Sequence, residues 1–163
     1  MVNKEAEMFQ KQGMASLSQG DTKKALEFFD KALKHDDKYF PALNNKGVLL
    51  LELKDYENAE KCFEKVIQLN PADKMALYNR AYALLMLGDY QQSVELLDFF
   101  LGNVSRKSDF FKFGMYLQAK GFYELKEYDK SRSLLNDCLK KDKNFKEAQE
   151  LLNEVLKEIE NNS

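Results

Sequence analysis

DYENAEKCFEKVI, at residues 55–67, recurs three more times in altered form along this chain of 163 residues. Its counterparts are DTKKALEFFDKAL at 21–33, DYQQSVELLDFFL at 89–101 and EYDKSRSLLNDCL at 127–139. The four segments align without gaps, and their first residues lie 34, 34 and 38 positions apart. A fixed period of about 20–50 residues is typical of proteins built from stacked copies of one small unit. The sequence therefore predicts a repeat protein.

Two columns of small residues repeat with the same spacing. The first column holds Gly13, Gly47, Ala81 and Ala119, and the second holds Ala25, Ala59, Ser93 and Ser131. We expect the first column on one helix of each unit and the second on its partner helix. Small residues there would leave no bulk between the two backbones, so the helices can pack closely. One such pair cannot cover its own apolar face, so the pairs must stack on one another.

The second unit shows where each pair of helices begins and ends. Pro41 suits the first turn of a helix, because the N–H that proline lacks has no partner there. Asp55 is a good N-cap for the second helix, and Asn70-Pro71 ends that helix, because the residue before a proline resists the α conformation. Gly20 and Gly88 mark the turn between the helices in two other units, where glycine can take a positive φ.

The 34-residue period and the pattern of small and aromatic columns resemble the tetratricopeptide repeat (TPR). In that family a turn such as Gly88-Asp89-Tyr90 separates the two helices, and a proline such as Pro71 closes the repeat. The resemblance covers about residues 6–145. It implies an all-α, right-handed superhelix of four helix-turn-helix repeats within a single domain, 1–163. The repeats would span about 6–39, 40–73, 74–111 and 112–145.

The chain departs from the family pattern in two ways. The closing proline is replaced in three of the repeats, by Asp37, Ser105 and Lys143. Phe100 stands where the family prefers a small residue, and it lies beside the longer third interval.

The extra residues of that interval fall at about 102–111, because the columns keep their register through Leu97 and resume by Met115. Ser108 suits the N-cap of a helix, and Asp109 suits its first turn. We therefore expect one added turn at the N-terminal end of the fourth repeat's first helix. The nearby phenylalanines would then pack together, with Phe110, Phe111 and Phe113 near Phe99 and Phe100.

A different pattern follows the repeats. One apolar stripe runs through the last segment at helical spacing: Ala148, Leu151, Leu152, Val155, Leu156 and Ile159. We expect a helix at about 146–160 that caps the last repeat, as repeat arrays require at their ends. The alternative is that this stripe forms the seam of a homodimer.

The composition argues against catalysis and against nucleic-acid binding. The 25 basic and 27 acidic residues give a net charge of −2, which favours neither a nucleic acid nor a membrane surface as partner. His35 is the only histidine, and Cys62 and Cys138 lie outside any ligand motif, so we expect no metal, no cofactor and no enzyme. No apolar run approaches the roughly 20 residues that cross a bilayer. With no signal peptide visible, a cytoplasmic location is expected.

In the resembled family the first helix of each repeat lines a concave surface that binds partners. The residues at these positions are not needed for the packing columns: Asn44, Asn45, Val48, Leu51, Met75, Tyr78, Asn79, Tyr82, Leu85, Met86, Phe113, Tyr116 and Tyr123. Aromatic residues and methionine are enriched in interface cores, and an asparagine can offer a donor and an acceptor to a peptide backbone. The sequence thus predicts a protein-interaction adaptor that holds a peptide or helix of another protein. Tyr78 and Tyr82 are its expected anchors.

Three alternatives concern this surface. It could be core, covered by neighbouring helices or by the tail, or it could serve a homodimer. Some TPR domains instead clamp the C-terminal carboxylates of chaperones with two lysines, two asparagines and one arginine. Those five places hold Gln10, Met14, Asn45, Met75 and Asn79 here, or Asn44, Val48, Asn79, Phe113 and Leu117 one repeat later. Only one residue matches in each register, so we expect no carboxylate clamp.

Overall fold

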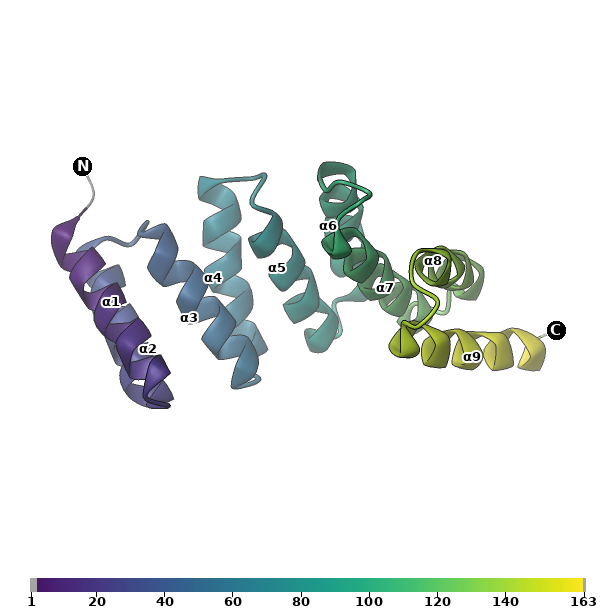
Figure 1. The fold of residues 1–163 in the computed structure, drawn as a ribbon, viewed down its shortest axis with the longest axis horizontal. Helices are drawn as coiled ribbons and strands as arrows, with labels where there is room; N and C mark the ends of the chain where they lie inside the picture. The colour runs from purple at the N-terminus through teal and green to yellow at the C-terminus, as the bar shows by residue number, and fades with distance from the viewer. Residues whose placement is uncertain (1–2, 163) are drawn as a thin grey trace. The chain divides into compact units, whose positions relative to one another are not determined.

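A computed structural model describes residues 3–162 of the chain (Figure 1). This range forms nine α-helices and no strand. The helices are α1 (Lys4–Ser18), α2 (Thr22–His35), α3 (Phe40–Glu52), α4 (Tyr56–Leu69), α5 (Lys74–Leu87), α6 (Tyr90–Asn103), α7 (Asp109–Glu124), α8 (Tyr128–Lys141) and α9 (Lys146–Asn161). The chain divides into two compact units, residues 1–83 and 84–163, and the boundary falls within α5. The predicted all-helical content is confirmed.

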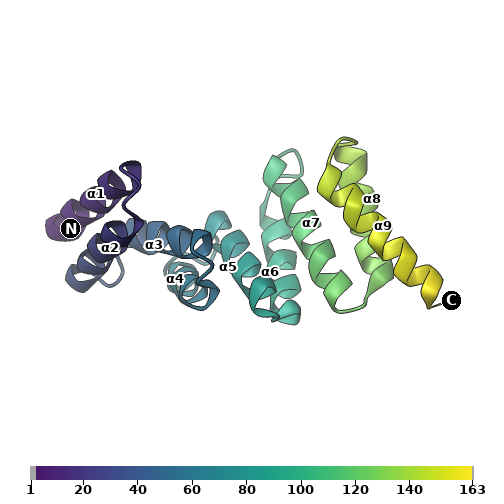
Figure 2. The same ribbon diagram turned by 90° about the horizontal axis from the view of Figure 1, so that it is seen from below.

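Helices that follow one another in sequence pack as pairs. In the first unit α1 contacts α2, α3 contacts α4, and α2 contacts α3. In the second unit α7 contacts α8 and α6, and α9 contacts both α8 and α7 (Figure 2). One large residue of the second helix lies at the centre of a pair, because Phe29 and Phe63 in the first unit and Leu135 in the second are fully buried.

The small column makes room for side chains rather than for backbones. A Cβ atom added to Gly13 would lie 2.5 Å from the ring of Phe29, and one added to Gly47 would lie 2.7 Å from the ring of Phe63. The expectation that no bulk separates the two helices is therefore wrong, because an aromatic ring of the second helix occupies the space above each glycine. In the fourth repeat Ala119 stands at the glycine position, and the smaller Leu135 replaces the phenylalanine in the same apolar cluster.

A small residue at the glycine position thus faces a large ring, and a larger residue there should be tolerated better when the ring is replaced by a smaller side chain. Gly47→Ala is expected to lower the free energy of unfolding by about 1 kcal/mol, because overpacking against Phe63 outweighs the gain in helix propensity. Phe63→Leu alone should cost a similar amount, whereas the double variant, which copies the Ala119–Leu135 pair, should lose less than the sum. Denaturant unfolding measures all three. Gly102→Ala is the control, since a Cβ there meets nothing within 4 Å. Additive losses would contradict the size pairing.

The turns inside the helical pairs share one geometry. Asp21, Asp55 and Asp89 cap the second helices, and each side chain accepts a hydrogen bond from the backbone N–H three residues later. The residue before each cap has a positive φ, as predicted for Gly20 and Gly88. The same position holds Lys54 and Lys126, both with φ of 61°. These lysines adopt a conformation that favours glycine, so the turn is set by its place in the repeat as well as by its residue.

Polar side chains link successive pairs at one repeated position. The residue at this position donates a hydrogen bond to an acidic side chain of the preceding helix: Lys46 to Asp30 at 2.6 Å, Arg80 to Glu64 at 3.1 Å, and Gln118 to Asp98 at 2.9 Å. Arg80 also donates to Glu60 at 2.7 Å. These bonds fix the register of one helix on the next in addition to the apolar packing.

The longer third interval lies where the sequence predicts it. Helix α7 has 16 residues against 14 in α5, and it begins at Asp109, capped by the Ser108 side chain. The aromatic packing differs in detail from the expectation. Phe113 contacts Phe145, with ring centroids 5.8 Å apart, and Gly114 rather than a phenylalanine provides the space beside Phe100.

Candidate functional site

The first unit holds most of the predicted partner-binding positions, on the equivalent faces of α3 and α5. Val48 and Met75 are exposed, with 41% and 46% of their surface accessible. The other six positions are half-buried: Asn44, Asn45, Leu51, Tyr78, Asn79 and Tyr82. We call these eight residues the α3–α5 patch. On α5 the positions 75, 78, 79 and 82 follow helical spacing, so their side chains lie on one face.

Tyr82 has a ring partner that sequence reasoning missed. Its ring meets that of Tyr56, the first residue of α4, edge to face at a centroid distance of 6.3 Å. Burial raises the pKa of the Tyr82 hydroxyl, and the neighbouring Tyr56 raises it further. The repeat offers a signal for this contact, because Tyr56, Tyr90 and Tyr128 all open second helices. The phenol of Tyr82 is therefore held in place on one side by Tyr56.

In the second unit the remaining predicted positions differ in how exposed they are to solvent. Met86 and Phe113 are exposed. Leu85 is buried with 4% of its surface accessible and lies 3.7 Å from the position of a Cβ on Gly121, so its assignment to the binding surface is wrong. The space above Gly121 is filled by Val94, whose Cγ1 atom lies 2.5 Å from the position of that Cβ, and Leu85 lies beside it. Tyr116 and Tyr123 are half-buried and pack against the apolar cluster that α9 helps to form.

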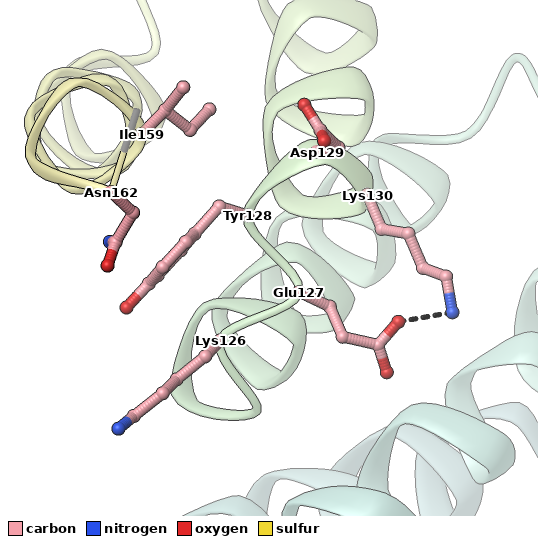
Figure 3. Close-up of a pocket in the computed structure, with 7 residues that line it drawn as sticks. All are labelled: Lys126, Glu127, Tyr128, Asp129, Lys130, Ile159 and Asn162. Atoms are coloured by element: carbon pink, nitrogen blue, oxygen red, sulfur yellow. Dashed lines mark ion pairs between the residues drawn. The ribbon is translucent and has the colours of Figure 1, made fainter.

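Two further aromatic residues border Tyr116 and Tyr123. The ring centroids of Tyr116 and Phe145, which lies just before α9, are 5.1 Å apart, and those of Tyr123 and Tyr128 are 5.9 Å apart. Figure 3 shows the Tyr128 ring between the turn that carries Lys126 and the end of α9 that carries Ile159 and Asn162. These contacts confirm in part that the tail covers the last repeat's surface.

The cysteines and the histidine do not form a reactive site. Cys62 and Cys138 are buried. Burial raises the pKa of both thiols, that of Cys138 to about 12, so neither is a thiolate near neutral pH. His35 contacts Glu5 and stacks on Phe9. Within residues 3–162 no three His, Cys, Asp or Glu side chains are grouped to hold a metal ion.

Among the described helices, none combines the length and the apolar character that crossing a bilayer requires.

Family models match most of the chain. Three models of the tetratricopeptide repeat match residues 6–39, 40–73 and 62–95. A model of the Fis1 C-terminal tetratricopeptide repeat matches residues 114–162, which include α9. The repeat models together span 6–95, more than half of the chain. No curated protein matches the sequence.

Solved structures of TPR proteins have the same fold. MamA from Desulfovibrio magneticus RS-1 superposes with a TM-score of 0.84 at 20% identity, over 93% of this chain and 83% of that one. A TPR protein from Parabacteroides merdae gives a TM-score of 0.79 at 22% identity, over 94% of this chain and 59% of that one. The first TPR domain of Spaghetti (RPAP3), solved with the HSP90 peptide SRMEEVD, gives 0.64 at 17% identity, over 77% and 99%. At these identities the likeness concerns the fold alone.

Proposed function

The chain belongs to the tetratricopeptide-repeat family, and from this premise we propose that it is a non-catalytic adaptor that binds a peptide or helix of another protein. The observation that carries the proposal is the α3–α5 patch. Exposed apolar side chains and half-buried tyrosines and asparagines share equivalent faces there, and the core does not use all of their surface. Interface cores have this composition.

The residues of the patch have distinct proposed roles. Tyr78 and Tyr82 are the aromatic anchors, because rigid rings contribute much contact area at little loss of side-chain entropy. Asn45 and Asn79 hold the partner's backbone, each through one donor and one acceptor group. Met75 and Val48 supply the apolar contacts around them, and methionine adapts to partners of different shape. In the second unit Met86, Phe113, Tyr116 and Tyr123 are proposed as partner contacts of that unit.

The expected ligand differs from that of the RPAP3 domain. That domain was solved with SRMEEVD, an acidic peptide. Here the five places of a carboxylate clamp carry no lysine or arginine, and two of them hold the exposed Met14 and Met75. A carboxylate held there would have no cation to offset the loss of its hydration.

Selection from a random peptide library displayed on phage tests the proposal. We expect the intact protein to enrich peptides that bind in solution by fluorescence anisotropy, and that bind more weakly when the α3–α5 patch is altered. The homodimer is the rival, and sedimentation separates the two, because an adaptor should remain a monomer at micromolar concentration. A stable dimer, with no enriched peptide, would favour self-association instead.

A further inference from the structure

A row of tyrosines in the second unit is bordered by a row of glutamates on α9. The tyrosines are Tyr116 and Tyr123 of α7 and Tyr128 of α8, and all three pack against the apolar cluster that includes the buried stripe of α9. The glutamates are Glu147, Glu150, Glu154 and Glu158. We call the two rows together the acidic tyrosine face.

The two rows run over comparable lengths. Tyr116 and Tyr123 are two helical turns apart, about 10 Å along α7, and Glu147 to Glu158 extend about 16 Å along one side of α9. Helices α7 and α9 are in contact. At one end of the rows the Tyr128 hydroxyl lies 3.5 Å from the Glu158 carboxylate. Figure 3 shows this end of the face, where Tyr128 lies beside the last turn of α9.

The charge around these phenols is negative. Burial is the first cause that raises the pKa of Tyr116, Tyr123 and Tyr128, and glutamates of α9 are the next. For Tyr116 these are Glu147, Glu150 and Glu154. Among residues 3–162, no Lys or Arg forms an ion pair with any of the four glutamates. None of the four glutamates therefore has an ion-pair partner among the described residues.

The row places like charges next to one another along α9. Glu150, Glu154 and Glu158 follow one another at i, i+4, a spacing at which like charges destabilise a helix. Some other exposed acidic side chains of the second unit form ion pairs, as Asp129 does with Arg132 and Asp137 with Lys140. A cation from outside the chain would relieve the repulsion on α9. The phenol rings beside the glutamates suit such a cation, because an aromatic face attracts an ammonium or guanidinium group.

We propose that the acidic tyrosine face binds an arginine- or lysine-rich segment of the partner protein. Guanidinium groups would stack on Tyr116 and Tyr123 and pair with the carboxylates of Glu150 and Glu154. A nucleic acid does not fit this face, because the carboxylates would repel its phosphates. A metal ion does not fit either, because among the described residues no three His, Cys, Asp or Glu side chains are grouped to hold one. The inference rests on the proposed adaptor function and adds to it the charge of the partner.

The test uses a labelled peptide of alternating leucine and arginine, and two counterparts in which every arginine becomes glutamine or glutamate. Fluorescence anisotropy with the full chain should show binding of the arginine peptide, with an affinity that falls as salt is added. The double variant Glu150→Gln, Glu154→Gln should weaken that binding about tenfold, since each exposed pair contributes modestly. A matched double variant, Glu27→Gln with Glu52→Gln, removes two exposed charges from the first unit and should leave binding unchanged.

Thermal melting separates binding from folding. The variant at 150 and 154 should melt no lower than the parent chain, because it removes like-charge repulsion. Equal binding of the glutamine peptide, or equal losses in the two double variants, would overturn the inference.

The phage-selected peptides distinguish this inference from the adaptor function. If they bind but are neutral or acidic, and their affinity is unchanged in the variant at Glu150 and Glu154, the inference fails and the adaptor function stands. If no selected peptide binds while the arginine peptide does, the α3–α5 patch loses its support as the binding surface, and the acidic tyrosine face takes that role.

Discussion

Removal of residues 146–163 is expected to destabilise the second unit by about 4–6 kcal/mol. Four side chains of α9, Ala148, Leu151, Leu152 and Val155, are buried against α7 and α8. Full burial of a large aliphatic side chain contributes about 1.5–3 kcal/mol, and a compact unfolded state reduces the sum. Denaturant unfolding followed by circular dichroism should show a lower midpoint for the shortened chain. The loss should appear at any protein concentration, because the contacts are within the chain.

Two substitutions on the same helix serve as matched controls. Leu152 keeps 8% of its surface accessible, whereas Leu156, one turn further along, keeps 39%. Leu152→Ala should therefore cost about 2–4 kcal/mol and Leu156→Ala less than about 1 kcal/mol. A shortened chain that melts at the temperature of the full chain would show that α9 is no cap. Its stripe would then be free for a partner or a second copy.

Local chemistry made the helices and their turns predictable. Asp21, Asp55 and Asp89 cap helices whatever packs around them, and Ser108 does the same for α7. The position of the longer third interval was predictable from spacing, since each helix repeats the columns of the equivalent helix in the preceding repeat. These features depend on residues within one turn of the helix or one period of the repeat, and a single sequence contains all of that information.

The depth of each surface residue was less predictable, because it depends on neighbours outside the repeat pattern. Leu51 and Leu85 occupy equivalent positions, yet Leu51 is half-buried and Leu85 is buried beside Gly121. From their positions in the repeat, Tyr116 and Tyr123 were predicted to lie on the partner-binding surface. The tail that packs on them follows no column, so its docking could not be inferred from the period.

Tyr82→Ala is expected to weaken the binding of a selected peptide by about 2 kcal/mol, or about 30-fold, as truncation of an aromatic anchor does. The ring is half-buried and held by Tyr56, so its exposed side is presented to a partner in one orientation. Loss of the ring contact should also lower the free energy of unfolding by about 1 kcal/mol. Fluorescence anisotropy and thermal melting on the same sample measure the two effects.

Two further variants divide the role of the Tyr82 ring between binding and folding. Tyr82→Phe keeps the ring and should change the affinity less than about threefold, because removal of one neutral hydroxyl costs about 0.5 kcal/mol. Tyr56→Ala removes the same ring contact from the α4 side, so it should match the stability loss of Tyr82→Ala with a smaller loss of affinity. If Tyr82→Ala instead lowers the melting temperature strongly and leaves peptide affinity unchanged, Tyr82 is a core residue. The anchor of the α3–α5 patch must then be sought among its exposed members, Met75 and Val48, whose truncation would affect binding alone.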